Sequence, residues 1–146
     1  MSTENRKFLI TAVLSIHGLG HVGAIGALVT RKLGYVAAAD QAGWLAARSW
    51  LLPSLASPIA TALATGFWAV SMIGFIAAAS SFWGVLVPSE AWRTLAVASA
   101  VVSTLGLALF IGTWPLFNTV AALSVNAAVL VTQLWLSWPA RALFGR

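Results

Sequence analysis

Charged residues divide the chain into long apolar runs without charge. Residues 8–30 form the first run, and basic pairs border it on both sides. Residues 49–89 form a second uncharged stretch, and residues 94–140 form a third. A helix needs about 20 apolar residues to cross the hydrocarbon core of a bilayer. Each run therefore predicts at least one membrane-spanning helix.

The third run is too long for one span. A continuous helix over residues 94–140 would be about 70 Å long, more than twice the thickness of the hydrocarbon core. Gly112-Thr113-Trp114-Pro115 combines a glycine and a proline near the middle of this run, which indicates a hinge. We therefore expect two helices, one on each side of the hinge.

The pattern as a whole predicts an all-α membrane protein with four transmembrane helices in a single domain, residues 1–146. Ser57-Pro58 is expected to begin the second helix, with the serine as its cap and the proline in its first turn. Residues 35–52 are alanine-rich with a polar arc, which predicts an interfacial helix or a re-entrant segment between the first two spans. The four predicted helices cover about residues 8–30, 59–85, 91–111 and 116–138.

Composition agrees with a membrane protein. Hydrophobic residues make up 60% of the chain and charged residues 8%, with a mean hydropathy of +0.93. Soluble domains carry about 25% charged residues, so we expect the lipid bilayer to be the main solvent of this chain. No cysteine is present, which excludes disulfides and thiolate sites.

The net charge of +5 does not indicate nucleic-acid binding, because the basic residues border the apolar runs instead of forming one face. With the N-terminus inside, five basic residues lie on the cytoplasmic side and three outside. The positive-inside rule then places both termini in the cytoplasm. The five inner residues are Arg6, Lys7, Arg93, Arg141 and Arg146, and the three outer ones are Arg31, Lys32 and Arg48.

The candidate functional residues are His17 and His21, the only two histidines of the chain. Their spacing of four places both on one face of the first helix, near the middle of the membrane. Polar side chains also lie near the middle of the other three helices: Ser71 in the second, Ser99 and Ser103 in the third, and Asn126 in the fourth. We therefore predict a polar layer in the bundle interior, with the imidazoles bonded to Asn126 or to serine hydroxyls. In the simplest interpretation these bonds hold the helices together.

Two other patterns bear on this layer. Thr119, Asn126 and Gln133 recur every seven residues, so they share one helical face. The glycines of the first helix predict a close approach by another helix; they are Gly20, Gly23 and Gly26.

A functional interpretation of the histidines is a ligand site made of His17, His21 and Asn126. Zinc would need more ligands than two histidines, and the apolar runs contain no acidic residue, so we predict no metal site. A haem or pigment needs one or two histidines and remains possible, as does a quinone. The acidic residues Glu4, Asp40 and Glu90 lie near water, so the sequence predicts no catalytic set.

Several motifs resemble a group of small bacterial four-helix integral membrane proteins whose activity is not known. The similarity covers nearly the whole chain, and a looser similarity to DoxX-like proteins rests on the number of helices alone. It implies the four-helix topology and a bacterial cytoplasmic (inner) membrane, and no particular activity. The motifs are His17-Gly-Leu-Gly-His21 in the first helix, Ser57-Pro58-Ile59 before Trp68, the stretch from Glu90 to Ala96, and Trp138-Pro139.

The leading hypothesis from the sequence is a non-enzymatic membrane component. It would be an accessory or structural subunit of a larger membrane complex, or would associate with itself. The alternative is a binder of a hydrophobic small molecule or of a His-ligated cofactor such as haem, a pigment or a quinone. A small lipid or redox enzyme of the membrane is a third hypothesis.

Overall fold

The computed structural model describes residues 2–32 and 47–139, and these residues form helices and turns without any β-strand. Four helices within this part are long and apolar enough to cross a membrane. The predicted all-α fold with four spanning helices is therefore confirmed, and it is compatible with a multi-pass integral membrane protein. The helices are α1 (Thr3–Lys32), α3 (Ser57–Ser81), α4 (Trp92–Leu109), which follows the 3₁₀ turn Ser89–Ala91, and α5 (Leu116–Leu130), which continues as a π-helical turn, Val131–Trp135.

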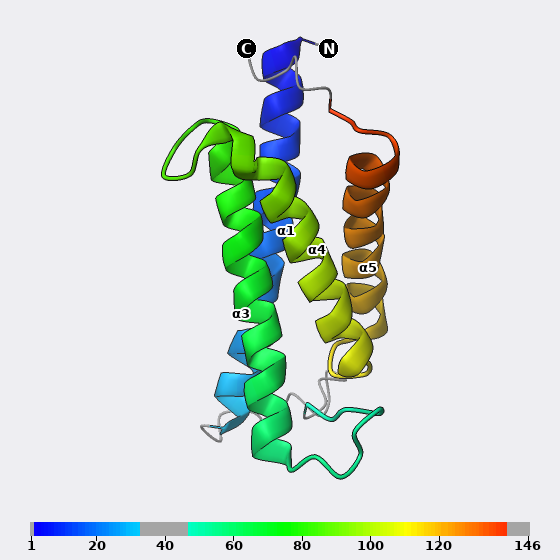
Figure 1. Cartoon of the computed structure of the whole chain (residues 1–146). Coiled ribbons are helices and arrows are strands. Elements are labelled where there is room, and N and C mark those ends of the chain that lie inside the picture. The colour runs from blue at the N-terminus through cyan, green and yellow to red at the C-terminus, as the bar shows by residue number, and fades with distance from the viewer. Residues whose placement is uncertain (1, 33–46, 140–146) are drawn as a thin grey trace.

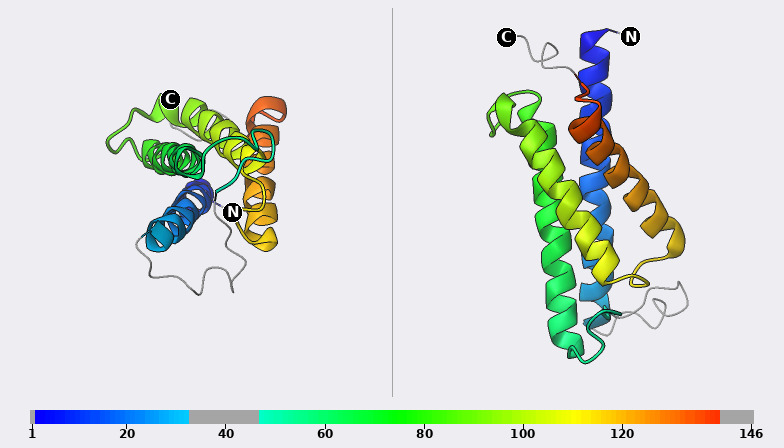
Figure 2. Two further views of the ribbon diagram at one scale, coloured as in Figure 1. Left: turned by 90° about the horizontal axis from the view of Figure 1, so that it is seen from below. Right: turned by 45° about the vertical axis from the view of Figure 1, so that its right-hand side comes forward.

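The helices run alternately in opposite directions, so the two ends of the described chain lie at the same end of the bundle (Figure 1). Neighbours in the sequence pack side by side: α1 against α3, α3 against α4, and α4 against α5. Seen from the right-hand side, α5 leans away from α1 towards its own N-terminal end (Figure 2). Helices α1 and α5 are not among the pairs that pack closely along their length.

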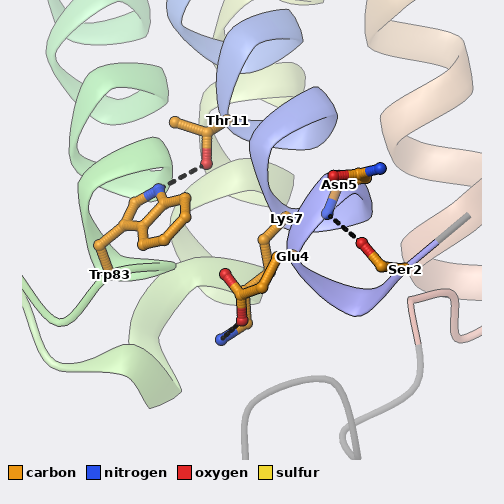
Figure 3. A network of polar contacts seen from close by, with 6 residues as sticks. All are labelled: Ser2, Glu4, Asn5, Lys7, Thr11 and Trp83. Carbon is orange, nitrogen blue, oxygen red and sulfur yellow. Dashed lines mark hydrogen bonds and ion pairs between the residues drawn. The ribbon is translucent and has the colours of Figure 1, made fainter.

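Helix α1 begins earlier than the apolar run does. The Ser2 hydroxyl accepts a hydrogen bond from the Asn5 backbone N–H at 3.2 Å, which is the geometry of a serine N-cap (Figure 3). Glu4 lies in the first turn, where a negative charge favours the helix dipole. These polar residues add a water-exposed extension to a helix that hydropathy alone begins at residue 8.

The tryptophan that follows α3 fastens this helix to α1. Trp83 Nε1 donates to Thr11 Oγ1 at 2.9 Å, and the Lys7 ammonium lies 6.0 Å from the centre of the indole ring (Figure 3). An indole with its ring in an apolar layer and its N–H bonded to a polar partner is typical of membrane interfaces.

Close helix contacts occur at glycines that the sequence analysis did not single out. A Cβ on Gly106 of α4 would lie 2.8 Å from Phe67 Cβ of α3, and one on Gly74 would overlap Ser99. A Cβ on Gly18 of α1 would lie 3.2 Å from Phe75 Cβ. Small residues at these points let the helices approach closely, as membrane helix packing requires.

Within the described chain, no other helix packs on the predicted glycine face of α1. No described atom outside their own helix backbone lies within 4 Å of a Cβ built on Gly20, Gly23 or Gly26. Gly20 and Gly23 are exposed. The sequence spacing identified a stripe of small residues correctly, but α3 packs on the neighbouring face that carries Gly18.

The hinge prediction is confirmed. Helix α4 ends at Leu109, α5 begins at Leu116, and Gly112 between them has a φ of 86°, which only glycine adopts readily.

At the start of α3, Pro58 lies in the first turn as predicted, but the cap prediction is wrong. Ser57 is already helical, and the cap is Ala56, which makes no side-chain cap bond.

Part of the predicted interfacial helix falls on described residues. Residues 47–56 form turns and bends, so the predicted helix is wrong at its C-terminal end. Trp50 is exposed, and its Nε1 donates to the Ala108 carbonyl at 2.5 Å, which fastens this loop to the end of α4. The remainder of the prediction, residues 35–46, lies outside the described residues.

The last predicted helix is shorter than expected because its end changes geometry. From Val131 the backbone widens into the π-turn, which ends at Trp135 instead of about residue 138. The Arg93 guanidinium donates to the Gln133 carbonyl, and Gln133 Nε2 donates to the Trp138 carbonyl at 2.6 Å. A cation at the C-terminal end of a helix compensates the helix dipole and its unpaired carbonyls.

Candidate functional site

Four polar side chains from three helices meet in the bundle interior, and we call them the polar layer: His17 and His21 of α1, Ser103 of α4 and Asn126 of α5. His17 Nε2 lies 2.8 Å from Asn126 Oδ1, and His21 Nε2 lies 3.0 Å from Ser103 Oγ. Asn126 Nδ2 donates to Ser103 Oγ at 2.9 Å. His21 Nδ1 lies 3.0 Å from the carbonyl oxygen of His17. The layer therefore joins α1 to α4 and to α5 by hydrogen bonds.

The carbonyl oxygen of His17 determines where the protons lie in the layer. Both imidazoles are neutral, because a charge near the middle of a membrane span is costly. A carbonyl oxygen only accepts, so His21 carries its proton on Nδ1 and its Nε2 accepts from the Ser103 hydroxyl. Ser103 Oγ then accepts from the Asn126 amide N–H, which leaves Asn126 Oδ1 facing His17. His17 therefore carries its proton on Nε2, and the lone pair of its Nδ1 is not used within the layer.

Aromatic rings hold the two imidazoles in place. The His17 ring meets Phe75 of α3 edge-on, with 4.6 Å between ring centres. The His21 ring meets Trp114 of the hinge at 5.7 Å, and the two imidazoles lie 5.2 Å apart. His21 and Asn126 are each 1% exposed, whereas His17 is only partly buried. His21 and Asn126 are thus enclosed by the bundle, while His17 lies at the edge of the layer and is partly exposed.

The structure confirms the predicted contact of His17 with Asn126 and selects one serine among the candidates. Ser103 joins the layer, while the hydroxyls of Ser71 and Ser99 donate to carbonyls of their own helices. Thr119 and Gln133 are buried on the same face of the last helix as Asn126, as their spacing predicted. They form no part of the layer, because they lie two turns away from Asn126 in either direction.

A groove of about 380 Å³ lies beside the layer, between the middle of α1 and the first half of α5. Its volume is within the range of small-molecule pockets, about 300–1,000 Å³. Ile16 and Phe117 line it and are 71% and 82% exposed, so the groove opens on the outer surface of the bundle. The complete lining is Val13, Ile16, His17, Gly20, His21, Trp114, Phe117, Asn118, Ala121, Ala122 and Val125.

The sequence analysis did not predict the groove, because it results from the tilt of α5 away from α1. It also missed Trp114 as a site residue and named it only as part of the hinge. Trp114 is 8% exposed, and its Nε1 is fully buried without a hydrogen-bond partner, as are Trp68 Nε1 and Thr113 Oγ1. A tryptophan beside a hinge and a histidine can pack inwards, and only the position of the hinge could have suggested this.

The chemistry available in the groove is limited to few groups. Within residues 2–32 and 47–139, no three histidine or acidic side chains are grouped so that they could hold a metal ion. Three of the four imidazole nitrogens are engaged in the layer, which leaves His17 Nδ1. The groove thus combines mostly apolar walls with His17, whose Nδ1 has no partner in the layer, and with the exposed amide of Asn118 near the start of α5.

Comparison with models of protein families, with curated proteins and with solved structures gives no significant match, so the fold and the groove alone carry the functional argument.

Proposed function

We propose that this chain is a multi-pass membrane protein that binds a small lipid-soluble molecule in the groove between α1 and α5. The observation that carries the proposal is the combination of an apolar groove with the partly buried imidazole of His17 in its wall. Ligand pockets typically pair apolar walls with a few polar groups that orient the ligand. Because the groove opens on the membrane-facing surface, a ligand can enter it from the bilayer.

A structural role is the second candidate, and one observation favours it. His21, Ser103 and Asn126 satisfy one another within the layer, so the layer needs no ligand to pair its buried groups. In this alternative the chain is an accessory subunit of a membrane complex or associates with itself, and the groove holds bulk lipid or a partner helix. The two candidates differ in whether the groove retains a defined small molecule.

A ring placed in the groove separates the two candidates. Gly20 lines the groove, and a side chain there meets no described atom within 4 Å, so Gly20→Phe should fill the groove without disturbing the fold. Gly23→Phe is the matched control, because Gly23 is equally open on α1 but does not line the groove. The measurement is native mass spectrometry of each protein in nanodiscs made with its native lipids.

We expect the wild type and Gly23→Phe to retain a molecule of defined mass, and Gly20→Phe to lose at least nine-tenths of it. The same bound masses in all three proteins, or none in any of them, would contradict the ligand proposal. Equal helix content by circular dichroism and equal monodispersity by size-exclusion chromatography would show that the loss is not caused by misfolding, and the unfolding temperature of Gly20→Phe should fall only by the stability that the lost ligand contributes.

We further propose that the chain resides in a bacterial cytoplasmic membrane with both termini in the cytoplasm. The proposal rests on the sequence, in which five basic residues fall in the segments assigned to the cytoplasm and three in those assigned to the outside. Reporter fusions at residue 146 should therefore read cytoplasmic, and a reporter inserted at Ser54 should read external. The reverse pair of readings would overturn this orientation.

A further inference from the structure

We infer that the molecule bound in the groove is a hydrophobic alcohol or phenol, whose hydroxyl group donates a hydrogen bond to His17 Nδ1. This inference rests on the proposed ligand-binding function and adds the chemical class of the ligand. Its basis is the direction of the hydrogen bonds in the polar layer, which decides what the groove can recognise.

His17 lines the groove, and its Nδ1 is the one imidazole nitrogen that the layer leaves without a partner, so the two rings offer an acceptor and no donor. The N–H of His17 is directed to Asn126 Oδ1, and the N–H of His21 is directed to the His17 carbonyl. His17 Nδ1 therefore offers a lone pair to a ligand, and a lone pair binds a donor such as a hydroxyl group. A ligand whose only polar group is a carbonyl would place two acceptors face to face.

The other polar groups near the groove do not change this preference. The indole N–H of Trp114 is unpaired but fully buried, so a ligand in the groove does not reach it. Asn118 is exposed in the lining near the start of α5, two turns from Asn126, and its amide both donates and accepts. Asn118 can therefore form a hydrogen bond with a hydroxyl ligand or with a carbonyl ligand. The preference for a hydroxyl ligand comes from His17.

The shape of the groove fits one polar group on an apolar body. Apart from His17, His21, Trp114 and Asn118, its lining consists of aliphatic side chains, one glycine and one phenylalanine. The exposed rim at Ile16 and Phe117 leaves room for a hydrocarbon chain to continue into the bilayer. Quinols, sterols and long-chain alcohols share this chemistry, and the inference concerns the hydroxyl group that they have in common.

Two probes test the hydroxyl directly: 4-decylphenol, and 4-decylanisole, in which a methyl group replaces the hydroxyl proton. Affinity is measured for the full-length protein in nanodiscs from the increase of its unfolding temperature with probe concentration. We expect the wild type to bind the phenol about tenfold more tightly than the anisole, because one hydrogen bond of about 1.4 kcal/mol corresponds to this factor.

Two substitutions of His17 divide its two functions. The amide of His17→Gln places its N–H near the position of Nε2, so it retains the bond to Asn126 and removes the acceptor at Nδ1. The amide of His17→Asn places an oxygen near the position of Nδ1, so it retains the acceptor and loses the bond to Asn126. We expect His17→Gln to abolish the tenfold preference for the phenol and to keep the stability. We expect the opposite result for His17→Asn.

Each outcome bears on one proposal. Equal affinity of the wild type for the two probes, both lost in Gly20→Phe, would overturn the hydroxyl inference and leave the groove as a binding site. A phenol preference that persists in His17→Gln would also overturn the inference. Failure of the wild type to bind either probe, or equal binding by Gly20→Phe, would contradict the groove proposal itself.

Discussion

Replacing His21 by leucine should lower the free energy of unfolding in detergent by about 1–3 kcal/mol. Leucine keeps the apolar contact with Phe75 and Trp114 but removes both hydrogen bonds of the buried ring. Each intramembrane hydrogen bond contributes about 0.6–1.7 kcal/mol. Denaturant or thermal unfolding of the purified protein measures the loss.

The amide variants show which bond accounts for the loss. His21→Asn can still donate to the His17 carbonyl, and His21→Gln can still accept from Ser103, so each should lose roughly half as much as His21→Leu. Val22→Leu is the control on the neighbouring, exposed position. If His21→Leu is as stable as Val22→Leu, the polar layer does not hold the bundle together.

A short flexible epitope inserted after Ser103 should abolish the folded protein. Ser103 lies in the middle of α4, so the insertion leaves backbone groups unpaired within the membrane, where each costs several kcal/mol. The insertion also rotates Gly106 relative to Ser103 around the helix axis. Ser103 bonds to α1 whereas Gly106 packs against α3, so both contacts cannot then form together. The same epitope between Ile111 and Gly112 should be tolerated, because both residues are exposed in the hinge.

The measurement is the yield of monodisperse protein by size-exclusion chromatography in detergent. The hinge insertion provides the control for the epitope itself, since it adds the same residues to the same chain. Equal yields from the two positions, whether high or low, would show that α4 and α5 are not the separate spans described here.

Much of the fold could be predicted because membrane insertion follows simple rules of length and polarity. The uncharged runs gave the four helices, and the length of the third run required the hinge at Gly112. Asn126 could be paired with the histidines from depth alone, because polar side chains in the middle of different spans have few other partners. These predictions depend on local composition and on the rise of a helix, and both can be read along the chain.

The remaining features depend on contacts between helices or on water outside the membrane. The Ser2 cap extends α1 beyond the apolar run, and hydropathy does not detect such an extension. Gly20 and Gly18 are equally small, and only the packing of α3 shows which of them lies in an interface. The groove depends on the tilt of α5, which no residue of α5 indicates by itself.

The central claim is the arrangement of protons in the polar layer, and ¹⁵N NMR of the histidine rings tests it most directly. The chain contains two histidines, so the spectrum of protein labelled in histidine contains four ring nitrogens. Couplings to the ring protons distinguish Nδ1 from Nε2, and the chemical shift distinguishes a protonated nitrogen from one with a lone pair.

The structure predicts different tautomers for the two neutral rings, with the proton on Nε2 of His17 and on Nδ1 of His21. Addition of 4-decylphenol should shift the signal of His17 Nδ1 and leave both nitrogens of His21 unchanged. A proton on Nδ1 of His17, or the same tautomer in both rings, would contradict the hydrogen-bond directions from which the free acceptor on His17 and the class of the ligand have been derived.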